Sequence, residues 1–90
     1  IQSTGQSRSS QIEDLEHRLA MINDGLTDRE RQVCARIVLG MTSDGIAADL
    51  GVGSQTVLTY RKRAYARLDI SSQNALFALC LNANPTSTRL

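Results

Sequence analysis

Apolar residues recur every three or four positions along most of this chain, a period typical of amphipathic helices rather than strands. No alternating run is long enough to predict a sheet. The spacing instead predicts helices over residues 11–25, 27–39, 43–50, 54–68 and 72–81. We therefore expect an all-α fold, in which four helices at 26–81 form one domain and a linker helix at 11–25 precedes it.

The expected linker helix carries an apolar stripe with heptad-like spacing. The stripe consists of Ile12, Leu15, Leu19, Ile22 and Leu26, spaced 3, 4, 3 and 4 residues apart. Such a stripe either packs on the helix's own domain or forms a short coiled coil with a second copy of the chain. It covers fewer than the roughly three or four heptads that indicate a coiled coil, and this favours packing within the domain.

Residues with specific roles at helix ends mark the boundaries of the other helices. Thr27 and Glu30 form a capping-box pattern at the start of the helix at 27–39. Gly51 follows the last apolar position of the helix at 43–50, where glycine takes a positive φ at little steric cost. These signals predict a sharp start for one helix and a sharp end for the other.

Residues 43–62 combine a short helix, a glycine-bearing turn and the start of a cationic helix. Ala47 is small where two helices must approach closely, and Val57 is an apolar residue that the second helix turns back onto the first. The helix at 54–68 holds four cations and no acid. Because phosphate contacts supply much of the affinity for DNA, this unbalanced charge predicts a DNA-binding helix-turn-helix.

Size and composition agree with one small helical domain. The 90 residues are 41% hydrophobic but only 3% aromatic, so the core must come from aliphatic side chains, which suits packed helices. The net charge of +1 hides an uneven distribution, because residues 1–25 carry two cations and four acids, whereas 26–81 carry seven cations and five acids. Polar residues at 1–10 predict a disordered linker or an expression remnant, and 82–90 predict a flexible tail.

Several kinds of chemistry find no support in the sequence. Cys34 and Cys80 are 46 residues apart, fit no metal motif, and are interpreted as buried thiols. The acids have no partner nucleophile, and there is no glycine-rich phosphate loop, so we expect no enzyme activity, no cofactor and no metal. Without a signal peptide or a long apolar run, we expect a soluble, cytoplasmic protein that does not contact a membrane.

Five segments occur together in an order and spacing that point to one family. They are LTDRERQV (26–33), Gly40-Met41-Thr42, IAADLGV (46–52), Thr56-Val57 and ARLDISSQN (66–74). With them the chain resembles the LuxR/GerE family of bacterial helix-turn-helix regulators over about residues 26–81. The resemblance implies a four-helix domain at the C-terminus of a transcription factor, usually preceded by a sensory domain. It also implies that the helix at 54–68 enters the major groove and that the last helix forms the dimer contact.

The chain departs from the family's usual residues at four positions. Glutamate, lysine, histidine and glycine are replaced, respectively, by Gly45, Leu58, Tyr60 and Asp69. Because of Leu58, the family's base-reading code is not carried over to this chain. Arg67 has two interpretations, a phosphate contact or an ion pair with Glu30 that matches the family's acid and cation at these places, and the ion pair is favoured.

The helical period divides the candidate DNA contacts into groups. The expected base contacts are Gln55, Leu58, Thr59 and Lys62, since glutamine suits adenine, lysine suits guanine, and a leucine or threonine methyl suits the thymine methyl. The expected phosphate contacts are Thr42, Ser54, Thr56, Tyr60, Arg61 and Arg63. The expected dimerisation contacts are Leu76, Leu79, Ile12, Leu15 and Leu19.

The leading hypothesis is sequence-specific binding of double-stranded DNA, as the output domain of a bacterial transcription regulator. Two copies are expected to form a homodimer on DNA, and RNA polymerase is a further candidate partner. The alternative is a helical protein-interaction or dimerisation module that uses the heptad stripe and the last helix without binding DNA. Retention on a DNA or heparin column under a salt gradient distinguishes the two hypotheses.

Overall fold

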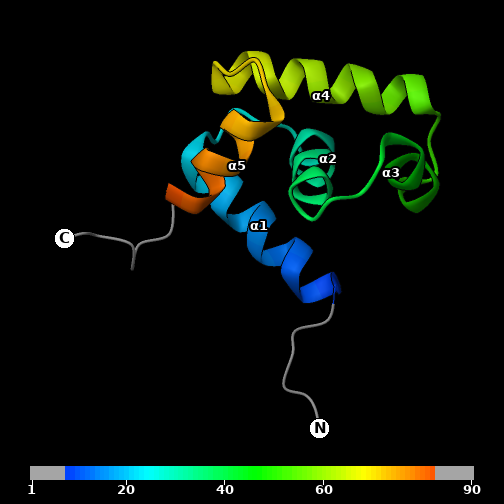
Figure 1. Ribbon diagram of the computed structural model, residues 1–90, viewed down its shortest axis with the longest axis horizontal. Coiled ribbons are helices and arrows are strands. Elements are labelled where there is room, and N and C mark those ends of the chain that lie inside the picture. Colours follow the sequence, from blue (N-terminus) through cyan, green and yellow to red (C-terminus); the bar gives the residue numbers. More distant parts are fainter. Residues whose placement is uncertain (1–7, 83–90) are drawn as a thin grey trace, which may run out of the picture.

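The computed structural model describes residues 8–82, which form five α-helices and no strand (Figure 1). The helices are α1 (Arg8–Ile22), α2 (Asp28–Val38), α3 (Ser43–Leu50), α4 (Ser54–Leu68) and α5 (Gln73–Asn82). The all-α prediction is therefore confirmed. The expected disordered segment and flexible tail lie mostly outside the described residues, but residues 8–10 and Asn82 are helical, contrary to that expectation.

Side-chain caps explain where α2, α3 and α5 begin. At α2 the capping box is complete, because the Glu30 N–H donates to the Thr27 hydroxyl (3.2 Å) and the Thr27 N–H donates to the Glu30 carboxylate (2.9 Å). The hydroxyl of Thr42 accepts from the N–H of Gly45 at the start of α3 (3.0 Å). The hydroxyl of Ser72 accepts from the N–H of Ala75 at the start of α5 (3.1 Å). Each cap satisfies a backbone donor that the helix itself leaves unpaired.

Two residues with positive φ end the helices that flank the turn region. Gly51 closes α3 at φ 70° and ψ 34°, as predicted. Asp69 closes α4 at φ 60° and ψ 44°, the left-handed conformation in which the family usually has glycine. Asp69 pays a steric penalty there that glycine does not, although aspartate tolerates this conformation better than most residues.

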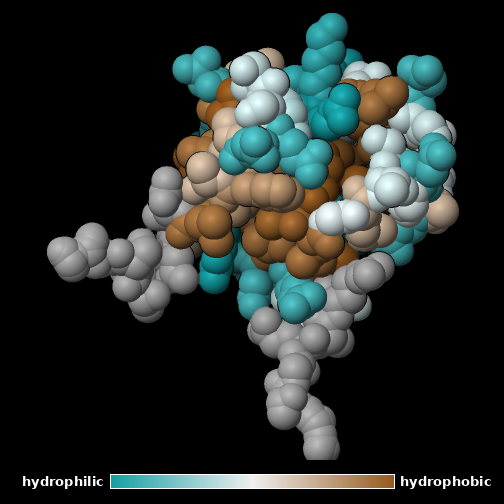
Figure 2. Space-filling model, viewed as in Figure 1, coloured by the Kyte–Doolittle hydropathy of each residue, from teal (hydrophilic) through white to brown (hydrophobic). Residues whose placement is uncertain are grey.

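The core lies between α1, α2 and α5 on one side and the packed pair α3 and α4 on the other. Helix α2 is central, since it contacts all four other helices, and α4 lies along one edge across α2 and α3 (Figure 1). The buried apolar side chains are Ile12, Leu19, Leu26, Val33, Cys34, Ala35, Ile37, Ile46, Ala47, Val57, Ala64, Leu76 and Cys80. In Figure 2, which has the same view as Figure 1, hydrophobic side chains lie across the middle of the molecule, where α1, α2 and α5 meet.

The heptad stripe of α1 packs on the chain's own domain. Ile12 is 7% exposed and Leu19 is fully buried, and both belong to the single core cluster. Leu76 of α5 is also fully buried. The expectation that these three residues contact a second copy is therefore wrong, because a side chain that fills its own core has no surface left to offer. Leu15 and Leu79 are partly exposed.

The two cysteines are buried and free, as the sequence predicts. Burial, followed by the neighbouring Cys80 and Glu30, raises the pKa of the Cys34 thiol to about 12. Burial also raises the pKa of Cys80. Both thiols therefore stay protonated near neutral pH and behave as small apolar side chains. Within residues 8–82, no helix is both long and apolar enough to cross a membrane.

Candidate nucleic-acid interface

Helices α3 and α4 pack against each other across a three-residue turn. Val57 of α4 is 1% exposed, and Ala47 of α3 is buried in the same core cluster. The N–H of Val52 returns to the carbonyl of Ala47 (3.0 Å), which closes the turn after Gly51. The structure thus agrees with the roles predicted for Ala47, Gly51 and Val57. Together these residues hold α3 and α4 in a helix-turn-helix.

The outer side of α4 carries polar side chains that are free of the core. Val57 and Ala64 face inward and are buried, whereas Gln55, Thr59 and Lys62 are exposed. Successive residues of an α-helix are roughly 100° apart around its axis, so these three exposed residues share one side. They form a stripe directed away from the domain, which we call the reading stripe.

Cations lie on both flanks of the reading stripe. Arg61 and Arg63 are two positions apart and therefore roughly 200° apart around the helix axis, with Lys62 between them. Lys62 and Arg63 are exposed, and Arg61 is half-buried. No acid lies on α4 to neutralise them. A double-stranded nucleic acid that receives α4 in a groove presents a phosphate backbone on each side, which suits this arrangement.

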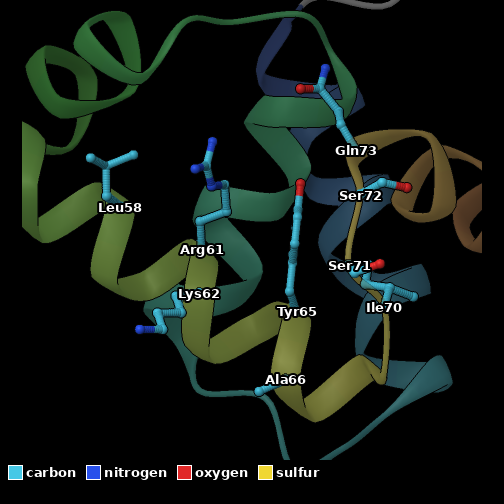
Figure 3. A pocket seen from close by; sticks show the side chains of 9 residues that line it. All are labelled: Leu58, Arg61, Lys62, Tyr65, Ala66, Ile70, Ser71, Ser72 and Gln73. Carbon is cyan, nitrogen blue, oxygen red and sulfur yellow. The ribbon is translucent and has the colours of Figure 1, made fainter.

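Leu58 does not stand free on the outer surface as the sequence suggests. It is half-buried and lines one end of an open groove of about 610 Å³ that runs between α4 and the start of α5. In Figure 3, Leu58, Arg61 and Tyr65 project to the same side of α4, whereas Lys62 and Ala66 project to another side. Leu58 thus lies at the margin of the reading stripe rather than at its centre.

The hydroxyl of Thr59 is turned toward its own helix. It donates to the backbone carbonyl of Gln55, one turn earlier, at 3.1 Å. This bond uses the only proton of the hydroxyl and leaves the methyl group as the apolar part of an exposed side chain. Sequence reasoning did not detect this bond, although threonine at that spacing within a helix commonly forms one.

The expected phosphate contacts occupy different environments. Thr42 is exposed at the start of α3, and its hydroxyl proton is available because its oxygen only accepts in the cap. Thr56 and Tyr60 are half-buried, and Tyr60 packs against the core. Ser54 is the exception, because its hydroxyl donates to the carboxylate of Asp44 at 2.8 Å. A hydroxyl bonded to a carboxylate is a poor phosphate ligand, so the structure disagrees with that assignment of Ser54.

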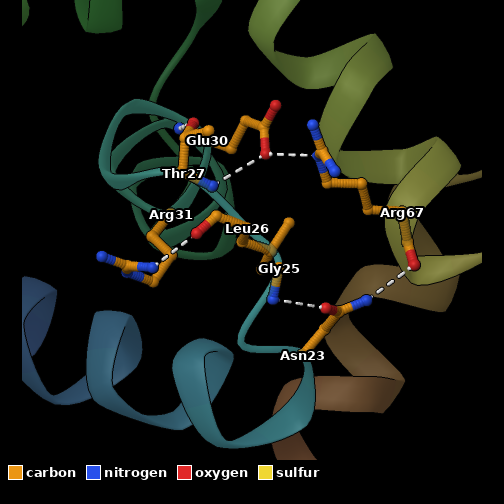
Figure 4. Close-up of polar contacts among 7 residues, drawn as sticks. All are labelled: Asn23, Gly25, Leu26, Thr27, Glu30, Arg31 and Arg67. Carbon is orange, nitrogen blue, oxygen red and sulfur yellow. Dashed lines mark hydrogen bonds and ion pairs between the residues drawn. The ribbon is translucent and has the colours of Figure 1, made fainter.

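Glu30 and Arg67 form an ion pair that joins α2 to the last turn of α4 (Figure 4). The guanidinium Nε lies 3.0 Å from the carboxylate oxygen, with the Glu30 side chain 2% exposed and that of Arg67 47% exposed. The same oxygen accepts the N–H of Thr27. Asn23 adds a second link, since its side-chain amide donates to the Arg67 carbonyl at 2.8 Å. The favoured interpretation of Arg67 is confirmed, and it fixes the end of α4.

Arg36 links three helices and was missed by sequence reasoning. From α2 it pairs with Asp49 of α3 at 2.6 Å and with Glu16 of α1 at 3.7 Å, and it also donates to the backbone carbonyl of Gln32 at 3.0 Å. No local pattern predicts the pairs with Asp49 and Glu16, because these partners lie on other helices and far from Arg36 in sequence. Arg36 therefore stabilises the packing of α1, α2 and α3, of which α2 and α3 contact α4, and does not belong to the outer surface of α4.

Comparisons with known proteins agree with this geometry. The family model described as "Bacterial regulatory proteins, luxR family" matches residues 24–79, which cover the helix-turn-helix and the helices packed on it. A fold of this kind defines a bacterial regulatory helix-turn-helix domain. The chain belongs to the luxR family.

Several curated relatives are similar to the chain. A protein of Aeromonas salmonicida, named as an HTH-type transcriptional regulator in the exeN 3′ region, is 41% identical over 83 residues, covering 90% of this chain and 42% of the relative. The transcriptional regulatory protein NarL of Mycobacterium tuberculosis is 37% identical over 72% of this chain and 30% of its own length. UhpA of Escherichia coli is 41% identical over 54% of this chain and 25% of its own length. No solved structure matches the chain significantly.

The chain thus spans less than half the length of these relatives.

Proposed function

We propose that this chain binds double-stranded DNA in a sequence-specific manner, as the output domain of a bacterial transcription regulator. The observation that carries the proposal is the outer side of α4, where an exposed polar stripe has cations on both flanks and no acid on the helix. Membership of the luxR family and the names of the relatives as transcriptional regulators support it.

In this proposal α4 lies in the major groove. That groove is about 12 Å wide and admits an α-helix, and the base edges there distinguish all four base pairs. Gln55 and Lys62 lie at the two ends of the reading stripe and carry the groups suited to adenine and guanine, respectively. Arg61 and Arg63 face opposite backbones as anchors, and Thr42 adds a hydroxyl at the start of α3.

We further propose that two copies bind a pseudo-palindrome as a homodimer. A single reading stripe covers only a few base pairs, and two half-sites about one helical turn apart multiply the specificity. An apolar groove between α1, the end of α2 and α5 is lined by Leu15, Val38, Phe77 and Leu81, and Leu81 is 69% exposed. Together with Leu79, this surface replaces the buried residues as the dimer contact.

Selection of bound sequences from a random DNA pool tests the proposal. We expect one enriched motif, whose binding weakens with salt by a log–log slope of roughly −3 or steeper per domain, because Arg61, Lys62 and Arg63 displace counterions. Arg63→Ala should weaken all sequences about equally and reduce the slope by about 1, whereas Lys62→Ala should relax the preference at particular base pairs.

Arg29→Gln is a matched control, since Arg29 is an exposed cation of α2 that donates to Gln32 of its own helix and belongs neither to the reading stripe nor to the apolar groove. It should leave both the motif and the slope unchanged. Failure to enrich any motif, together with a slope near zero, would overturn the proposal in favour of the protein-interaction module.

A further inference from the structure

Two neighbouring residues of the DNA-facing side of α4 offer apolar groups rather than hydrogen-bond donors. Leu58 has only a hydrocarbon side chain and reaches the surface at the margin of the reading stripe. Thr59 is exposed, but its only hydroxyl proton is held by the carbonyl of Gln55 at 3.1 Å. Neither side chain can donate to a base edge unless that bond breaks.

Because Leu58 and Thr59 offer no hydrogen-bond donor, they restrict which base can face them in the major groove. In the major groove guanine presents two acceptors, adenine an acceptor and a donor, and cytosine a donor. Thymine alone presents an apolar group, its C5 methyl, beside a single acceptor. An acceptor left against Leu58 and the Thr59 methyl loses its water without gaining a partner, which is unfavourable.

From this arrangement we infer that Leu58 and Thr59 select a 5-methylpyrimidine, thymine in ordinary DNA, at one position of each half-site. This inference rests on the proposed DNA binding by α4. The Thr59–Gln55 bond holds the threonine side chain in one rotamer, so its methyl is placed before DNA arrives. Gln55 and Lys62 lie one turn before and one turn after the pair, and therefore face the flanking base pairs.

The experiment removes single methyl groups from the DNA. In a duplex recovered by selection, each thymine is replaced in turn by deoxyuridine, which differs only in lacking the C5 methyl. We expect one thymine per half-site whose replacement weakens binding roughly fourfold, the loss that corresponds to removing one buried methyl group. Placing cytosine there should weaken binding more, and 5-methylcytosine should recover roughly the same factor.

Variants of the protein connect the effect to these side chains. Thr59→Ser keeps the hydroxyl and removes the methyl, so it should reduce the difference between thymine and deoxyuridine at that position. Thr59→Val keeps methyl groups and removes the hydroxyl, so it should retain the difference. Leu58→Ala should also reduce the difference between thymine and deoxyuridine. If this variant fails to fold because Leu58 is half-buried, the two variants of the exposed Thr59 are sufficient to test the inference.

Two results would overturn the inference without touching the proposed function. One is salt-dependent binding to a selected motif with no sensitivity to deoxyuridine at any position. The other is an equal loss at every thymine that the Thr59→Ser variant leaves unchanged, since this would come from altered DNA shape rather than from methyl contact. If no motif can be selected at all, the proposed DNA binding itself fails.

Discussion

Replacing Arg67 by alanine should destabilise the domain without changing its contacts to DNA. The change removes the guanidinium from Glu30, whose side chain is 2% exposed and whose remaining hydrogen bond comes from the N–H of Thr27. Removing one partner of a fully buried ion pair costs about 3–5 kcal/mol. Because the Arg67 side chain is 47% exposed, water reaches the vacated position and lowers that cost. We expect a loss of roughly 2–3 kcal/mol.

Thermal or urea unfolding measures this loss, which corresponds to a fall in Tm of roughly 10–20 °C for a domain of this size. Glu30→Gln keeps an oxygen for the Thr27 N–H but removes the buried charge. In that background Arg67→Ala should cost less than about 1 kcal/mol, because no unpaired carboxylate remains. Arg29→Ala is the control, since Arg29 is exposed and donates only to Gln32 of its own helix. Its cost should stay within about 0.5 kcal/mol.

The same variant separates the two interpretations of Arg67. At a temperature well below its Tm, Arg67→Ala should bind the selected DNA with the salt slope of the unaltered chain. A slope reduced by about 1 would mean that Arg67 contacts a phosphate. Strict additivity of Glu30→Gln and Arg67→Ala, or a loss no larger than that of Arg29→Ala, would refute the argument that the pair anchors α4.

The remaining predictions concern one turn, the core and the oligomeric state. Asp69→Gly should stabilise the chain by about 0.5–1 kcal/mol in urea unfolding, since glycine takes φ 60° without the penalty, whereas Asp69→Val should destabilise it. Stability should fall as pH rises from about 9 through about 12, because the Cys34 pKa is raised from 9.0 to about 12 in the folded chain and the unfolded thiol ionises first. Thermal melts across this range check the prediction, and Cys34→Ala should reduce the fall. In sedimentation equilibrium the chain should be monomeric at micromolar concentration and dimeric only on DNA, because Ile12 and Leu19 of the α1 stripe are buried in its own core. A dimer that persists at nanomolar concentration without DNA would contradict this.

Local signals in the sequence were enough to place most of the helices. The bounds predicted for α4 agree with the structure, and so do the capping box at Thr27 and Glu30 and the left-handed Gly51. Each of these features depends on residues within about one turn of each other, so the local sequence is enough to predict it. The pair of Glu30 with Arg67 was also predicted, but only because the family resemblance placed both residues.

Contacts between distant segments could not be predicted in this way. The short heptad stripe on α1 favoured packing within the domain, but its spacing could not show which of its residues would be buried against α2 and α5 and which would stay at the surface. The bond from Ser54 to Asp44 and the three-helix contacts of Arg36 depend on how α3 is placed against its neighbours. The candidate DNA contacts, most of them on α4, were therefore assigned without the competing hydrogen-bond partners that the fold supplies.

The separation of roles along α4 bears on how such a domain can diversify. Gln55 and Lys62 are exposed and belong to no core contact, and Thr59 bonds only to its own helix. Substitutions at such positions usually change stability by no more than about 0.5 kcal/mol. The side chains that hold α4 in place, Val57 and Arg67, lie on other sides of the same helix. A lineage of these domains can consequently exchange one binding-site preference for another through single substitutions, without first acquiring compensating changes in the scaffold.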